Sequence, residues 1–148
     1  MNNRKNKYRN GFKTLFIMLA SITIISCGGG DDNSKKMPEE IAFEFVDAVY
    51  NKKDLELIKG HSTDKLAKLA SHYRSIKSIQ RHLMSLRLDA ATIQITDVGG
   101  DFFRKSKKDT KVELHIRGER EGGIVADDRF LTLTWQDNRW KVAKVSKS

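Results

Sequence analysis

The spacing of apolar and polar residues changes along the chain and divides it into a helical part followed by a β-rich part. Residues 38–50 place apolar side chains at i, i+4, i+7 and i+8, which predicts an amphipathic helix that begins at Pro38. Residues 54–60 predict a short second helix. Residues 62–87 keep helical spacing, with a break expected between residues 73 and 78 where serines cluster.

The period falls from 3.6 to 2 after residue 91, which indicates β-strands. Apolar and polar residues alternate over residues 92–96, 112–117, 130–135 and 140–145, and Gly99-Gly100 predicts a bulge or bend. The connections are short and polar, so neighbouring strands must be antiparallel. Because one face of each strand is apolar, we expect an α+β fold in which the N-terminal helices pack on one face of an antiparallel sheet of about four strands.

The first 26 residues have the pattern of an export signal. Residues 1–13 carry five basic and no acidic residues, and residues 14–25 form an apolar run. A membrane-spanning helix needs about 20 apolar residues, so this run is too short for one. A basic segment followed by a short apolar run predicts a signal peptide.

The end of the apolar run, Ile24-Ile25-Ser26-Cys27, resembles the lipobox of bacterial lipoproteins. The resemblance implies cleavage between Ser26 and Cys27, a diacylglycerol on the Cys27 sulfur and often an acyl chain such as palmitate on the new amine. Two or three acyl chains hold a protein on a membrane almost permanently. Gly28 after the cysteine resembles lipoproteins sent to the outer membrane, so we expect a lipid-anchored protein there that faces the periplasm.

The lipidated cysteine is followed by a flexible tether and then by one folded domain. Residues 28–36 contain no apolar residue and cannot bury surface, so residues 27–36 are the predicted tether. The folded domain is expected over residues 37–148, a length that suits one domain and not two.

Two segments of that domain resemble a known superfamily. They are the helix pattern Pro-Glu-Glu-x-x-x-x-Phe-x-x-Ala-x-x-x-x-Lys-Asp over residues 38–54 and the closing run Asp-Asn-Arg-Trp-Lys-Val over residues 137–142. Both are similar to the nuclear transport factor two-like (cystatin-like cone) superfamily, and more narrowly to small bacterial lipoproteins that carry one such domain of unknown function. The resemblance implies a curved, cone-like sheet around the first helix, a pocket at the open end in some members, and often a homodimer formed through the sheet. It implies no particular reaction, because this fold hosts enzymes and non-enzymes.

Composition lowers the expectation of nucleic-acid binding and of metal or cofactor chemistry. The net charge is +9, but removal of residues 1–13 leaves 23 basic against 19 acidic residues, a charge of +4. The lone cysteine excludes a disulfide framework and a multi-cysteine zinc site. The four histidines lack metal-binding spacing, so we expect no metal, no cofactor and no nucleic-acid partner.

Two groups of residues are candidates for a functional site. A pocket inside the cone would be lined by three side chains of the helical part and by two tryptophans of the strands: Asp47, Tyr50, Tyr73, Trp135 and Trp140. A basic patch for anionic lipid or polymer would combine Arg74, Lys77, Arg81, Lys107 and Lys108, although a solvated helix is the favoured explanation of these charges. The charged strand face Glu113, His115, Arg117 and Glu119 is interpreted as a solvated sheet face, with a tuned general base or a dimer contact as alternatives.

These observations favour a membrane-anchored envelope lipoprotein that binds a protein or small ligand without catalysis. No catalytic motif is present in the sequence, so no catalytic residue is assigned. The alternatives are a pocket enzyme of the same cone fold and a basic adaptor that binds anionic envelope polymers.

Overall fold

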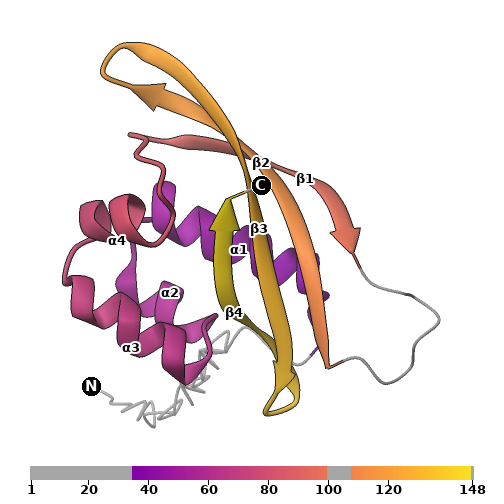
Figure 1. Cartoon of the computed structure of the whole chain (residues 1–148). Coiled ribbons are helices and arrows are strands. Elements are labelled where there is room, and N and C mark those ends of the chain that lie inside the picture. The colour runs from indigo at the N-terminus through magenta and orange to yellow at the C-terminus, as the bar shows by residue number, and fades with distance from the viewer. Residues whose placement is uncertain (1–34, 100–107, 148) are drawn as a thin grey trace, which may run out of the picture.

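A computed structural model describes residues 35–99 and 108–147, which form helices packed against one antiparallel sheet (Figure 1). The described part contains, in chain order, α1 (Pro38–Tyr50), α2 (Leu55–Gly60), α3 (Asp64–Tyr73), α4 (Ile76–His82), β1 (Ala91–Gly99), β2 (Asp109–Arg120), β3 (Gly123–Gln136) and β4 (Arg139–Lys147). None of the helices in these residues is long and apolar enough to cross a membrane. The α+β class and the order of helices before strands are confirmed.

Side-chain caps set the helix boundaries close to the predicted positions. Asp54 accepts hydrogen bonds from the backbone N–H groups of Glu56 (2.8 Å) and Leu57 (3.1 Å) and so begins α2. The predicted break in the third helical stretch lies at Arg74, whose backbone is left-handed (φ 59°), and Ser75 then caps α4. The predicted helix is therefore two helices, and the chain leaves helical conformation after His82 and not at Arg87.

The sheet has strand order β1-β2-β3-β4 with antiparallel neighbours throughout. Asp137 and Asn138 join β3 to β4 with positive φ angles of 53° and 61°, the backbone of a tight turn whose twist matches the strands. The long β2–β3 hairpin extends past β1 and β4 at one end of the sheet (Figure 1).

The sequence predicts a bulge or bend at Gly99-Gly100, but the bulge that the structure describes lies earlier in β1. The register shifts between Ile95 and Asp97, while Gly99 still pairs with Lys111; Gly100 lies outside the described residues. Ile95 pairs with buried Leu114, and Asp97 pairs with Glu113 on the other face. The extra residue therefore keeps the aspartate out of the core, which a regular strand could not do because alternate residues share a face.

The core forms where α1 lies against the sheet, and α1 contacts all four strands. Ile41, Phe45 and Val49 of α1 are fully buried, as are Leu114 and Leu131 of the sheet. Tyr50, which lies off the main apolar stripe of the helix, is also fully buried, whereas Phe43 is 39% exposed. The helices cover one face of the sheet, as the alternation predicts.

A charged side chain lies among these apolar residues. Arg129 of β3 pairs with Leu114 on the inner face and is 1% exposed. Its Nε donates to the Met84 carbonyl (2.6 Å), its Nη2 to the Ser85 carbonyl (3.2 Å), and its Nη1 lies 3.0 Å from the Asp127 carboxylate. The guanidinium therefore holds the segment after α4 against the sheet, with its charge balanced by Asp127.

Tyr50 holds the same segment from the helix side. Its hydroxyl donates to the Leu86 carbonyl (2.9 Å). Burial raises the pKa of the Tyr50 hydroxyl well above its ordinary value, so it stays a protonated donor at physiological pH. Residues 84–86 are thus tied to both the helix and the sheet.

Replacing Arg129 by alanine should lower the free energy of unfolding by about 3 to 5 kcal/mol, because it removes the buried donor of three backbone carbonyls and leaves the Asp127 carboxylate with Lys147 alone. Urea denaturation followed by circular dichroism measures the change. Arg117→Ala, on the outer face of the same sheet, is the control and should change stability by no more than about 0.5 kcal/mol. A loss below about 1 kcal/mol for Arg129→Ala would contradict a structural role for the guanidinium.

The ion pair also predicts a pH dependence. Burial alone would raise the pKa of Asp127, but the hydrogen bond and charge of Arg129, with a smaller effect of Lys147, hold that pKa below its ordinary value. A depressed folded-state pKa contributes stability above the unfolded value of about 3.9, and this contribution is lost as the pH falls through the folded value. Asp127→Asn should therefore lose less stability than the wild type between about pH 5 and pH 2 in urea denaturation.

The control for this experiment is Asp97→Asn, which removes an exposed carboxylate that forms no ion pair in the described part of the chain. It should keep the acid dependence of the wild type. If Asp127→Asn also keeps it, the Arg129–Asp127 pair does not contribute to stability in the way the geometry indicates.

Candidate functional site

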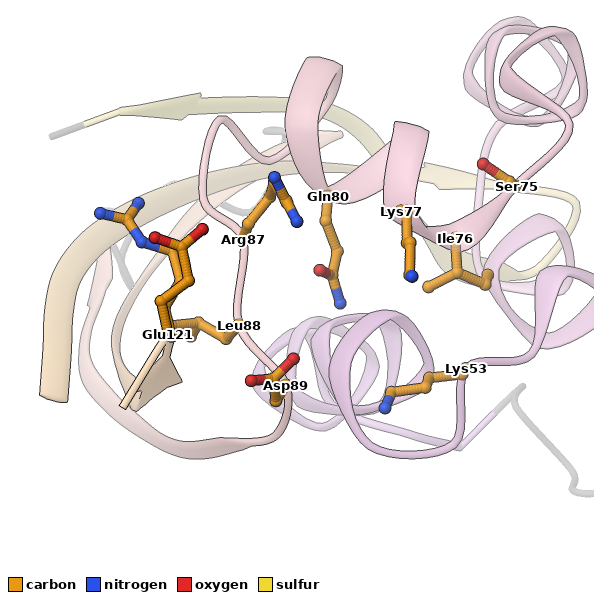
Figure 2. A pocket seen from close by; sticks show the side chains of 10 residues that line it. Lys53, Ser75, Ile76, Lys77, Gln80, Arg87, Leu88, Asp89 and Glu121 are labelled. Carbon is orange, nitrogen blue, oxygen red and sulfur yellow. The ribbon is translucent and has the colours of Figure 1, made fainter. Parts of the chain in front are cut away.

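A cavity of about 460 Å³ lies at the end of the domain where the β2–β3 hairpin turns. Four separate segments line it: Lys53 after α1, the first turns of α4, the residues after α4, and the hairpin turn. Its lining residues are Lys53, Ser75, Ile76, Lys77, Gln80, Arg87, Leu88, Asp89, Arg120 and Glu121. Figure 2 shows these side chains around one common space.

The wall made by residues 87–89 is held in place on both sides. Tyr50 and Arg129 tie down the residues just before it, and the Asp89 N–H donates to the Glu119 carbonyl (2.9 Å). Gly118 permits this close crossing, since a Cβ at that position would overlap the Ala90 carbonyl oxygen. The cavity therefore depends on the same contacts that hold the segment after α4.

Gln80 is the most buried polar side chain that faces the cavity, at 5% exposure. Its Nε2 donates to the Val49 carbonyl (3.3 Å), which fixes the side chain at the C-terminal end of α1. Its other amide atom, Oε1, has no hydrogen-bond partner within the described residues. Figure 2 shows the carboxamide between Lys77 and Arg87, above Asp89. The oxygen therefore keeps its capacity to accept a hydrogen bond.

Charged side chains surround this amide without neutralising one another. Four are cationic and two are carboxylates, and none of the six forms an ion pair within the described part of the chain: Lys53, Lys77, Arg87, Arg120, Asp89 and Glu121. The lining therefore carries a net charge of +2. In Figure 2, Glu121 lies on the side of the cavity away from Lys53. Convergent cations without protein partners attract an anion and can donate charge-assisted hydrogen bonds to it.

The structure does not bring the five sequence-predicted pocket residues together. The Tyr50 hydroxyl forms the core hydrogen bond to the Leu86 carbonyl described above. Asp47 lies on α1, where its carboxylate accepts from the Asn51 amide (2.9 Å) and pairs with Lys52 (3.4 Å). Neither residue lines the cavity.

The three aromatic candidates also lie elsewhere. Tyr73 is half-buried at the end of α3 and stacks on the His82 ring, with centroids 5.4 Å apart. Trp135 and Trp140 are register partners across the β3–β4 turn and pack edge to face at 5.4 Å. These contacts are of the kind that stabilise a fold, and none of the three residues lines the cavity.

The predicted basic patch is divided. Arg74, Lys77 and Arg81 lie on α4 or just before it, and Lys77 lines the cavity. Lys108 directly precedes β2, whose far end, at Arg120, is the one that lines the cavity with α4. A strand of this length separates its two ends by roughly 40 Å, so Lys108 and α4 do not share one surface. Lys107 lies outside the described residues.

The charged face of β2 is confirmed as the face opposite the core. His115 pairs across the sheet with Asp128, and its Nδ1 lies 2.7 Å from the Asp128 carboxylate. Both side chains are partly exposed, at 41% and 45%, which fits a solvated cross-strand pair. No three His, Cys, Asp or Glu side chains of residues 35–99 and 108–147 are placed to hold a metal ion. Ser26 and Cys27 lie outside the described residues.

Sequence comparison finds no relative, since no protein-family model matches the chain and no curated protein is similar to it. Comparison of structures does find similar folds. A solved structure whose title begins Rd1NTF2_05 has a TM-score of 0.51 and 10% identity, with 74% of this chain and 95% of that chain covered. A protein from Shewanella oneidensis MR-1, described as an NTF-2 like protein of unknown function, has a TM-score of 0.46 and 13% identity, with 74% and 97% covered.

These likenesses concern the fold alone, because the identities are low. The helices before the sheet, the antiparallel strand order and the match to a nuclear transport factor two structure agree with one another. The part of the chain that the structure describes therefore has a nuclear transport factor two-like fold, as the sequence resemblance implied.

Proposed function

We propose that this protein is a lipid-anchored, non-catalytic binding module of the bacterial envelope, and that it takes a small anionic solute into the cavity between α4 and the β2–β3 hairpin. The observation that carries the proposal is the set of unpaired charges, net +2, around the buried Gln80 amide. The volume of the cavity, about 460 Å³, falls within the range of small-molecule sites.

The chemistry of the lining suits binding. Lys77 and Arg87 flank the Gln80 oxygen, so an anion held between them would meet two cations, and a donor on the same solute would reach the amide. Ile76 and Leu88 supply apolar contact for the uncharged part of the solute. The carboxylates of Asp89 and Glu121 would repel a solute that is negative along its whole length. We therefore expect a solute with its anionic group at one end.

The anchoring part of the proposal rests on the sequence of the export signal. The predicted tether leads directly into α1, since Lys36 at its end pairs with Glu44 of that helix (2.7 Å). A flexible coil as long as the nine-residue predicted tether spans roughly 16 Å r.m.s., so a lipid on Cys27 would keep the domain close to the bilayer. The proposed location is the outer membrane, with the domain facing the periplasm.

Cys27→Ala tests the anchor. Expressed as the full chain in a bacterial host, the variant should keep residues 1–26 and carry no acyl group, because lipidation of the cysteine precedes cleavage at such a motif. Mass spectrometry of the N-terminal peptide and membrane fractionation measure both properties. Ser34→Ala, in the predicted tether, is the matched control and should be processed as the wild type. Normal processing of Cys27→Ala would contradict the anchor.

Charge reversal in the cavity tests ligand binding. Lys77→Glu and Arg87→Glu should each weaken the binding of small probes that carry their anionic group at one end, phenyl phosphate and benzoate, by about tenfold or more, since each change replaces an attraction by a repulsion. Isothermal titration calorimetry on the purified protein gives the dissociation constants.

The control is Arg117→Glu, which makes the same change of charge on the outer face of the sheet. It should keep the wild-type affinity for both probes. Equal affinities in all the variants would show that binding follows net charge alone, and failure of the wild type to bind either probe would contradict an anion site.

A further inference from the structure

We infer that a second groove, between α3 and β4, binds a single acyl chain that carries an anionic headgroup. The groove has a volume of about 650 Å³ and shares no lining residue with the cavity described above. Its floor is apolar and its rim is basic; the floor is formed by Leu66, Leu69, Leu83, Ala143 and Val145, and the rim by Lys65, Lys68 and Lys144.

The groove exists because β4 is an edge strand that α3 covers only in part. Leu66 of α3 faces the core and is 4% exposed, but Leu69, one helical turn further on, is 41% exposed. Val145 of β4 pairs with Leu131 on the inner face of the sheet and is only half-buried. Figure 1 shows α3 and β4 on the same side of the domain. The apolar surface between them is therefore left open to solvent.

Charge identifies the kind of molecule that fits. All three charged residues of the groove are lysines, no carboxylate lines it, and none of the three forms an ion pair within the described residues. Lys65 and Lys68 stand on α3 and Lys144 on β4, so the cations lie on both walls. Lysine stems pack along apolar surface while their ammonium groups stay at the edge. Apolar lining residues accompanied by cations of one sign complement a fatty-acid anion, with its chain in the groove and its carboxylate among the lysines.

The hollow shape favours a single chain over the surface of a bilayer. Docking on a bilayer requires several apolar side chains that protrude into the lipid, whereas among the apolar residues of the groove only Leu69 is exposed; Leu66 is buried, and Leu83, Ala143 and Val145 are half-buried. The proposed ligand is therefore a free single-chain amphiphile. This inference rests on the α3–β4 groove alone and is independent of the anion site near α4.

The test uses the full chain in its bacterial host and a fatty acid that carries a diazirine on its chain and an alkyne tag. After irradiation, the labelled peptides are identified by mass spectrometry. We expect labels in peptides that contain Leu69, Leu83 or Val145. Leu69→Asp should reduce labelling by about tenfold, since it removes a buried apolar contact of the chain. Lys68→Glu should reduce it as well, through repulsion of the carboxylate.

Two matched variants and two further probes separate the outcomes. Leu57→Asp changes a leucine of similar exposure (38%) on α2, and Arg117→Glu reverses a charge on the outer sheet face; both should keep wild-type labelling. The corresponding fatty alcohol, which lacks the charge, should label several-fold less. Equal loss with Leu57→Asp, or equal labelling by acid and alcohol, would overturn the proposal. Labelling only by a diazirine phospholipid in the membrane would overturn it in favour of bilayer docking.

Discussion

The structure depends on one buried cation. Arg129 stands on the inner face of β3, in line with Leu131 and Leu133, where a regular strand would place an apolar residue. A guanidinium in that position is stable only if its donors are paired. The pairing comes from Asp127 and from the carbonyl groups of Met84 and Ser85. The arginine thus converts the segment after α4 from a loose connection into part of the domain wall.

The position of the candidate anion site follows from that contact. Residues 87–89 form one wall of the cavity, and the hydrogen bond from Asp89 to Glu119 joins this wall to the β2–β3 hairpin. Gln80 links the segment before this wall to α1, because its backbone carbonyl accepts from the Leu86 N–H and its side-chain amide donates to the Val49 carbonyl. The charged side chains of the cavity form no ion pair within the described residues, whereas the charges that hold the fold, buried Arg129 and half-buried Asp127, are paired with each other. The ion pair that stabilises the fold and the charges that line the cavity therefore belong to separate residues.

The sequence was sufficient for the elements and their order, because both rest on local physics. The change of period separates helices from strands, Asp54 and Ser75 cap helices through their own side chains, and the strand connections are too short for anything but antiparallel pairing. The position of the bulge could not be predicted from local sequence, because it is determined by the pairing of Ile95 and Asp97 with β2. The sequence does indicate that Arg129 faces inward, because it lies two and four residues before Leu131 and Leu133 on the same strand. An arginine is, however, ordinarily assigned to the polar face.

The cavity could not be predicted because its residues come from four segments distant in the sequence. The Tyr50 hydroxyl is a candidate for a pocket by residue type alone. In the structure it donates a hydrogen bond to the Leu86 carbonyl, 36 residues further along the chain. Lys77 belongs to a charge run in the sequence, and it lines the cavity because α4 places its side chain beside Gln80. Residue type identified polar candidates, and tertiary packing decided which of them share a site.

Native-state hydrogen exchange tests the central claim most directly. The amides of Leu86 and Asp89 donate to the Gln80 and Glu119 carbonyls, and they belong to the segment that Arg129 and Tyr50 hold. If that segment cannot detach without breaking the buried contacts, both amides should exchange with the same opening free energy as the paired core amides of β2 and β3. Exchange of Leu86 and Asp89 at a much lower opening free energy, while the strands stay protected, would contradict the account.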